Sequence, residues 1–203
     1  MEILAHGLWA NAIFEGIAQA KKRERSKKEV WLTVFFGIAP DLFSFGLLFV
    51  SKILRSSFLL PYARARFQEE WGRGLAAISE NWLSGTPTVP DPASIPQYVN
   101  ALYGVTHSLL IFAVVFGIIW AIRRRPYLPF AAWGLHIGLD VFSHAEKFFP
   151  TPIFFPISDF HVGAVSWADP TFMAINYFLL ILTYLWLYRF SPRRPTAVQT
   201  ANV

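Results

Sequence analysis

Four long apolar stretches restrict this chain to one kind of architecture. They cover residues 30–54, 98–122, 126–145 and 170–188. Formal charge inside them is confined to Asp41, Lys52 and Asp140. A helix needs about 20 mostly apolar residues to cross the hydrocarbon core of a bilayer. Hydrophobic residues make up 54% of the chain and charged residues only 15%, against about 25% charged residues in an average soluble domain. The sequence therefore predicts an all-α, polytopic membrane helix bundle.

The first twenty residues are a fifth and weaker candidate for a membrane span. They carry Glu2, His6, Asn11 and Glu15 among apolar residues. Such a segment either crosses the membrane or forms a helix packed within the bundle. We therefore expect four to five transmembrane helices in a single membrane-embedded domain, residues 1–203.

Basic residues gather at three places next to the apolar stretches. The three runs are Lys21–Lys28, Arg123–Arg125 and Arg189–Arg194. Alternating the spans brings all three runs to one side of the membrane, which the positive-inside rule makes the cytoplasm. The sequence thus predicts a multi-pass protein with a cytoplasmic C-terminus. The net charge of +5 then reflects topology and contact with membrane lipids, and we expect no nucleic-acid partner.

The segment between the first two apolar stretches, residues 55–98, is expected to form a loop on the outer side. Its apolar residues recur at helical spacing, at Phe67, Trp71, Leu75, Ile78 and Trp82. That spacing predicts an amphipathic helix. The helix lies either in the outer membrane interface or on the mouth of the bundle.

Ionisable side chains inside the apolar stretches are the main functional signal. Four of the five histidines lie in apolar helical context, and the fifth, His161, lies in an outer loop. His136, Asp140 and His144 follow one another at intervals of four residues, which predicts that they share one face of a helix. Ionisable residues within spans are costly and usually functional. We interpret the set as a metal site; a proton or ion relay is the alternative.

Depth in the membrane supports convergence of these side chains. At a rise of ~1.5 Å per residue, Asp41, His107 and His136 each lie roughly 13–16 Å inside their spans. Imidazole and carboxylate ligands together favour zinc, with iron or manganese as alternatives, and the set is large enough for one or two ions. Thr106 and Ser108 flank His107 and are expected to orient its ring.

Four short motifs surround these residues. They are Ala5-His6-Gly7, Gly37-x-x-Pro40-Asp41, Gly104-x-Thr106-His107-Ser108 and His136-x-x-x-Asp140. In this order the motifs resemble those of the bacterial inner-membrane metal-dependent hydrolases of the LexA-regulated type. They are more distantly similar to zinc-dependent phospholipase C and the zinc-dependent single-strand nucleases. Two positions depart from the pattern, since Phe43 replaces a second acid and Leu102-Tyr103 stand where many relatives have His-Arg.

The resemblance carries several expectations. It implies a location in the bacterial inner membrane and a divalent metal, with zinc as the first choice. It implies that the metal ligands are His6, Asp41, His107, His136 and Asp140. The distant similarity suggests hydrolysis of a phosphoester, and in a membrane a lipid one.

The leading hypothesis is therefore a membrane-bound metal-dependent hydrolase whose site opens to the outer side. A metal-activated water attacks an ester or phosphoester of a small-molecule or lipid substrate. His144 or His161 is expected to act as general acid or base, because imidazole titrates near neutrality. Two alternatives remain open: an ion-coupled carrier or metal transporter that uses the same cluster, and a structural membrane protein whose polar contacts only pin helices.

Overall fold

The protein is all-helical in the residues that the computed structural model describes, which are 3–58, 95–146 and 149–189. The α-helices there are α1 (Ile3–Ala20), α2 (Lys27–Phe58), α4 (Gln97–Thr106), α5 (Leu109–Arg123), α6 (Ala131–Ser143) and α7 (Pro170–Arg189). A short 3-10 helix, η2 (Leu128–Phe130), precedes α6. The predicted helical class is confirmed.

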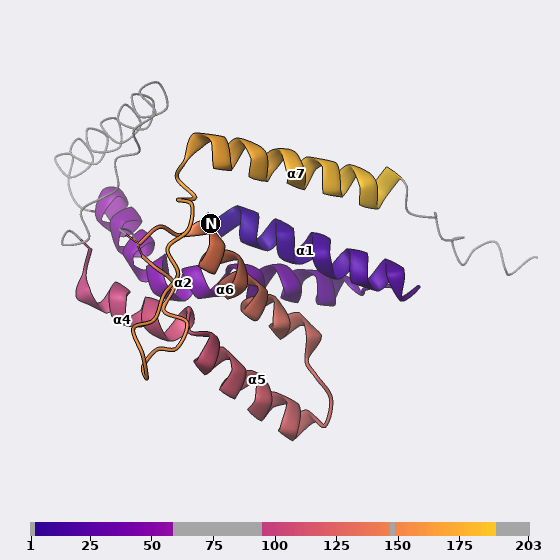
Figure 1. Ribbon diagram of the computed structural model, residues 1–203, viewed down its shortest axis with the longest axis horizontal. Coiled ribbons are helices and arrows are strands. Elements are labelled where there is room, and N and C mark those ends of the chain that lie inside the picture. Colours follow the sequence, from indigo (N-terminus) through magenta and orange to yellow (C-terminus); the bar gives the residue numbers. More distant parts are fainter. Residues whose placement is uncertain (1–2, 59–94, 147–148, 190–203) are drawn as a thin grey trace, which may run out of the picture.

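Helices α1 and α2 form the centre of the bundle and run antiparallel (Figure 1). Glycines let their backbones approach closely. A Cβ atom added at Gly37 would lie 2.8 Å from Cβ of Ala10, and one added at Gly7 would lie 2.9 Å from Cγ2 of Ile38. Interfaces between membrane helices are typically built from such small residues. The contact brings the backbone of His6 against Gly37.

The other helices surround this pair. Helix α6 contacts both α1 and α2, and α5 packs on α6. Helix α7 lies along α1 and runs in the same direction (Figure 1). Hydrogen bonds join them along their length: among them, Trp9 donates to Oδ1 of Asn176 (2.8 Å), and Gln19 donates to the carbonyl of Leu187 (3.4 Å). The bundle therefore gathers α1, α2, α6 and the α4–α5 junction around one interior region.

Two to three candidate membrane spans are found among the described helices, and the four to five that the sequence predicts are not shown. Two described helices are long and apolar enough to cross a membrane, α2 over Lys27–Ser51 and α7. A third span results if the bent pair α4–α5 is counted as one. The stretch 126–145 does not form the expected span, because η2 takes its first residues and α6 has 13 residues. Such a helix is about 20 Å long, short of the ~30 Å hydrocarbon core.

The stretch 98–122 is broken in its middle, at His107 and Ser108, where α4 and α5 meet at 53°. Ser108 begins α5, and its hydroxyl oxygen accepts from the N–H of Ile111 (3.2 Å). The same hydroxyl donates to the carbonyl of Phe155 (2.8 Å). Trp133 of α6 donates to the carbonyl of Thr106 (2.8 Å). The break therefore has its own hydrogen-bond partners, and it leaves His107 in a non-helical position inside the bundle.

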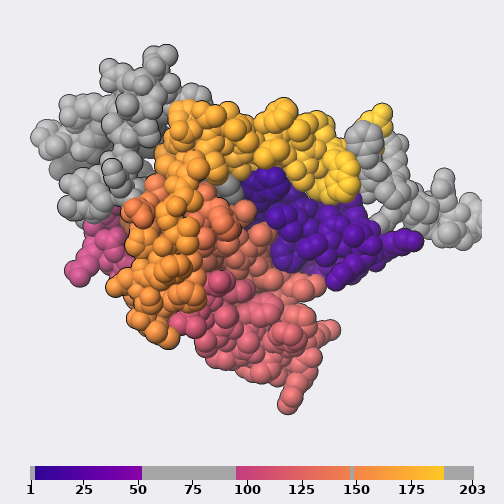
Figure 2. Space-filling view, in the orientation of Figure 1, coloured from indigo at the N-terminus to yellow at the C-terminus, as the bar shows by residue number. Residues whose placement is uncertain are grey.

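The segment between α6 and α7 folds back over the helices. Figure 2 shows it in orange across the front of the molecule, between α4 and α7. It is tied to the end of α6, since Ala164 donates to the carbonyl of His144 (3.0 Å) and Trp167 to that of Ser143 (2.8 Å). The amphipathic helix predicted around residues 67–82 lies outside the described residues.

Most basic residues of the described chain lie at one end of the bundle, and Lys52 and Arg55, near the end of α2, are the exceptions. Figure 1 places the ends of α1, α5 and α7 at the same side of the picture, with the α6–α7 segment at the other. Arg123–Arg125 follow α5 and Arg189 ends α7. This arrangement agrees with the orientation that the positive-inside rule predicts.

A labelling experiment tests that orientation. The chain has no cysteine, so Asp159→Cys and Arg125→Cys each introduce a single thiol at an exposed position. We expect an impermeant maleimide to label the first in intact spheroplasts and the second only after permeabilisation. Equal labelling of both after permeabilisation is the control. The reverse pattern in intact cells would overturn the orientation.

Candidate metal centre

Four of the predicted residues form a compact buried group, Asp41, His107, His136 and Asp140. They come from three parts of the fold: α2, the α4–α5 break and α6. One ligand atom from each lies within 4.8 Å of the others. The sequence prediction that these side chains converge is confirmed.

The distances within the group match a tetrahedral metal site. Nε2 of His107 lies 3.1 Å from Nε2 of His136 and 3.4 Å from Oδ1 of Asp41. Oδ2 of Asp140 lies 3.5 Å from the first nitrogen and 3.1 Å from the second. Nε2 of His136 and Oδ1 of Asp41 are 3.9 Å apart. Ligands of a tetrahedral ion with bonds of ~2.0–2.1 Å are about 3.3–3.4 Å apart, so most of these distances are close to those around a bound zinc ion.

The outer nitrogen of each imidazole has a hydrogen-bond partner. Nδ1 of His136 donates to the carbonyl of Gly37 (2.7 Å). Thr106 donates to the carbonyl of Leu102 (2.9 Å), and its oxygen lies 3.0 Å from Nδ1 of His107. Because a carbonyl can only accept, a neutral His136 carries its hydrogen on Nδ1, and its Nε2 lone pair faces Nε2 of His107 across 3.1 Å. These partners hold both rings with Nε2 towards the centre of the group, where a shared cation would be bound.

The second oxygen of Asp140 faces two further histidines. Oδ1 lies 2.9 Å from Nε2 of His6 and 3.3 Å from Nε2 of His144. The ring of His6 also stacks on that of His136, with centroids 3.7 Å apart. Asp140 therefore stands between two sets of nitrogen atoms, one on each carboxylate oxygen. His6 of α1 contacts the cluster through Asp140, and its role as a metal ligand stays a prediction.

His144 reaches this position by a route that differs from the predicted one. It does not continue the face of α6, because the helix ends at Ser143 and His144 takes an extended conformation, with φ −113° and ψ 133°. Its Nδ1 donates to the carbonyl of Phe149 (2.7 Å), which turns Nε2 back towards Asp140. The four-residue spacing thus predicts that His144 lies near Asp140, but it does not predict the extended backbone that brings it there.

The structure does not bring His161 to the cluster. Its side chain is exposed in the α6–α7 segment, and Nδ1 donates to the carbonyl of Asp159 two residues earlier (2.8 Å). His161 lies outside the four-residue spacing of His136, Asp140 and His144. The sequence suggests it as a general acid or base only because imidazole titrates near neutrality. No structural feature of the described chain supports a role for it in the site.

The cluster is almost completely buried, so its net charge strongly affects the stability of the bundle. His6, His107, His136 and Asp140 are each about 1% exposed or less, and Asp41 is 7% exposed. Two carboxylates with neutral imidazoles leave a charge of −2 in the bundle interior, and an uncompensated buried charge is strongly destabilising. One divalent ion balances this charge within the same donor set. The buried group could therefore hold a divalent metal ion.

Several supporting groups were not predictable from residue types. The carbonyls of Gly37 and Phe149 orient His136 and His144. Ser44, one helical turn after Pro40, donates to its carbonyl and lies 2.7 Å from Oγ1 of Thr106. Thr106, in contrast, orients His107 as the sequence analysis expects. Backbone acceptors leave no signal in the sequence.

Comparisons with protein-family models, with curated proteins and with solved structures find no match.

Proposed function

We propose that the protein is a membrane-bound metal-dependent hydrolase that cleaves an ester or phosphoester bond. The observation that carries the proposal is the pair of Nε2 atoms of His107 and His136, 3.1 Å apart and flanked by two carboxylates. Metal ligands in structural zinc sites are mostly cysteines, and this chain has none. Histidine and carboxylate ligands are typical of catalytic sites.

Each residue of the chain has a separate task in this proposal. Asp41, His107, His136 and Asp140 hold a divalent ion, with zinc as the first choice. With a fifth coordination position open to water, such an ion would lower the pKa of that water towards 7 and polarise a carbonyl or phosphoryl oxygen. Gly37 and Thr106 fix the two ligand rings through Nδ1, which keeps their lone pairs aligned. The ligand positions are thereby set before substrate binds, which favours catalysis.

His144 is the residue proposed for proton transfer. Its Nδ1 is occupied by the carbonyl of Phe149, so its Nε2 is the atom that faces Asp140. It is the most exposed of the histidines around Asp140, at 7%, and it lies where α6 gives way to the irregular segment. A proton acceptor at the edge of the cluster is placed to receive a proton from an attacking water and return it to a leaving group.

The second oxygen of Asp140 allows a second ion. His6 and His144 both direct Nε2 at Oδ1, and a carboxylate can bind one ion through each oxygen. Two ions suit phosphoester cleavage, because they stabilise both the attacking and the leaving oxygen. In that case His144 is a ligand and another group carries the proton. Metal stoichiometry distinguishes the one-ion from the two-ion form.

The proposed setting is the bacterial inner membrane, with the C-terminus in the cytoplasm and the site opening to the outer side. The candidate spans α2 and α7 support a membrane location. A substrate that carries an acyl chain has direct access to such a protein from the bilayer. We therefore propose lipid esters and phosphoesters as the first substrates to test.

An activity assay tests this function. Zinc-loaded protein in detergent is offered a phosphodiester chromogen, a short-chain ester chromogen and a phospholipid. We expect hydrolysis of at least one of them, and we expect Asp41→Asn to lower kcat/KM by about 100-fold or more, since losing even a hydrogen bond to a metal ligand costs 10–100-fold. Asp159→Asn, at an exposed position, is the matched control and should retain full activity.

Two results would contradict the proposal. Equal loss of activity in Asp41→Asn and Asp159→Asn would show that the cluster is not the active site. Zinc uptake into proteoliposomes, with no hydrolysis of any of the three substrates, would instead identify a carrier.

A further inference from the structure

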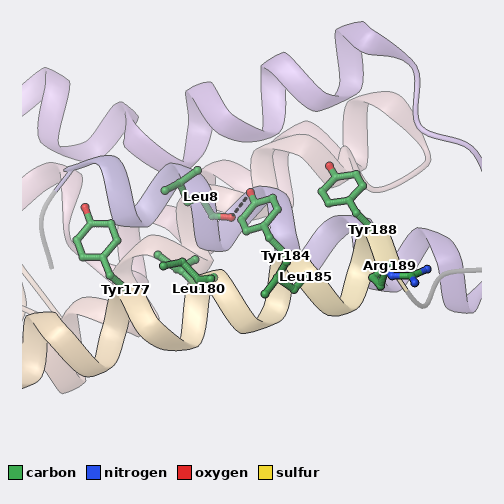
Figure 3. A pocket seen from close by; sticks show the side chains of 8 residues that line it. Leu8, Tyr177, Leu180, Tyr184, Leu185, Tyr188 and Arg189 are labelled. Atoms are coloured by element: carbon green, nitrogen blue, oxygen red, sulfur yellow. Dashed lines mark hydrogen bonds between the residues drawn. The ribbon is translucent and has the colours of Figure 1, made fainter.

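A groove runs between α1 and α7 on the outside of the bundle (Figure 3). Its volume is about 610 Å³, within the 300–1,000 Å³ that is usual for ligand pockets. Leu8 lines it from α1, and Tyr177, Leu180 and Leu185 line it from α7. None of its lining residues belongs to the His/Asp cluster. The groove is thus a separate apolar site.

The walls of the groove are held in place by hydrogen bonds. Tyr184 donates to the carbonyl of Leu8 (3.0 Å), as Figure 3 shows, and its oxygen accepts from Asn11 (3.1 Å). The ring of Tyr184 stacks with that of Tyr188, with centroids 5.9 Å apart. Tyr184 is therefore held in place in the groove with Tyr188 stacked beside it, and a bound molecule would not have to order the Tyr184 ring.

Positive charge lies at one end of this groove. Arg189, the last residue of α7, lines the groove beyond Tyr188. Gln19 of α1 bonds the carbonyl of Leu187, so the ends of the two helices meet there. Lys21 and Lys22 follow Gln19 within three residues. An apolar trough thus leads to a group of cations at the end of the bundle that we place in the cytoplasm.

We propose that this groove binds an anionic glycerophospholipid, with an acyl chain along Tyr184 and Tyr188 and the phosphate at Arg189. The long apolar surface of α7 places the groove within the hydrocarbon region. The ligand must therefore enter from the bilayer and offer an apolar chain joined to an anion. Arginine recognises phosphate through a planar, bidentate fork. A phospholipid of the cytoplasmic leaflet meets each of these requirements.

Native mass spectrometry of the delipidated protein tests this site. The protein is titrated with phosphatidylglycerol and phosphatidylcholine of the same acyl chains. We expect tighter binding of the anionic lipid, and Arg189→Gln should remove about a fivefold preference, the effect typical of one basic residue near an anionic lipid. Leu185→Trp, which fills the groove, should weaken binding of both lipids.

Matched variants distinguish a specific lipid-binding site from general attraction of lipids to the protein surface. Arg125→Gln removes an exposed cation at the same end, and Leu182→Trp enlarges an exposed side chain of α7 that does not line the groove. Both should bind lipid as the unchanged protein does. The proposal is wrong if Arg125→Gln lowers the preference as much as Arg189→Gln, or if both tryptophan variants behave alike. A dimer that Leu185→Trp converts to a monomer would assign the groove to a second copy of the chain.

Discussion

Protein purified without chelator should carry stoichiometric zinc or a similar divalent ion, and His136→Ala should lose it. The four donor atoms of Asp41, His107, His136 and Asp140 lie within 4.8 Å of one another. Removing one imidazole leaves three ligands and a cavity in the bundle. Because loss of a group that merely supports a ligand costs 10–100-fold in affinity, we expect loss of the ligand itself to weaken binding by about 100-fold or more. Elemental analysis of the detergent-purified protein measures the effect.

His161→Ala is the matched control for this experiment. It removes the same side chain from an exposed position whose Nδ1 bonds within its own loop. We expect its metal content to equal that of the unchanged protein. A metal-free wild-type protein, or equal metal content in all three proteins, would exclude the centre. The stoichiometry of the wild type also separates one ion from two.

Comparison of Asp140→Asn with Asp41→Asn refines the same result. Asp140 presents one oxygen to His107 and His136 and the other to His6 and His144. Asp41 presents Oδ1 to His107 and His136. If two ions are bound, Asp140→Asn should therefore reduce both, whereas Asp41→Asn should reduce one.

The convergence of the site could be predicted because helical geometry is regular. His136 and Asp140 share a face through their four-residue spacing, and the depth count brought His107 to the same level. Both inferences need only the pitch and rise of a helix. A charged residue inside an apolar span must also find a partner, so Asp41 could be assigned to the same cluster.

The number of spans could not be predicted in the same way. Hydropathy treats residues 126–145 as one apolar window, but it does not detect that Pro129 starts a 3-10 turn and leaves a helix of 13 residues. It also does not detect the break at His107 and Ser108. That break depends on acceptors and donors supplied from elsewhere, such as the carbonyl of Phe155 and the indole of Trp133. The sequence around His107 and Ser108 does not show that hydrogen-bond partners so far along the chain will be available.

The position of His144 depends on non-local contacts as well. The continued periodicity placed it on α6, whereas the carbonyl of Phe149 draws its ring back from beyond the helix end. Phe149 itself has a positive φ of 46°, which is uncommon for a residue with a side chain. A backbone conformation of this kind is selected by the surrounding packing and cannot be deduced from residue types.

The close approach of α1 and α2 leads to the second large effect, on stability. Gly37→Ala should lower the free energy of unfolding by about 1–3 kcal/mol, the usual cost of overpacking. The new methyl group would meet Cβ of Ala10 at 2.8 Å and the carbonyl oxygen of His6 at 3.2 Å. Neither atom lies at the end of a flexible side chain, so the helices must move apart. Thermal unfolding in detergent, followed by circular dichroism, measures the loss.

Gly37→Ala should also lower the metal affinity of the centre, although Gly37 contributes no metal ligand. Separation of α1 from α2 moves His6 away from the cluster, and it shifts the Gly37 carbonyl that orients His136. Gly46→Ala in the same helix is the control, because a Cβ there has no neighbour within 4 Å. The midpoint temperature of thermal unfolding of Gly46→Ala should be unchanged or higher, since alanine is favoured over glycine in a helix by roughly 0.5–1 kcal/mol. Equal midpoints and equal metal affinities for the two variants would show that contact between α1 and α2 does not support the centre.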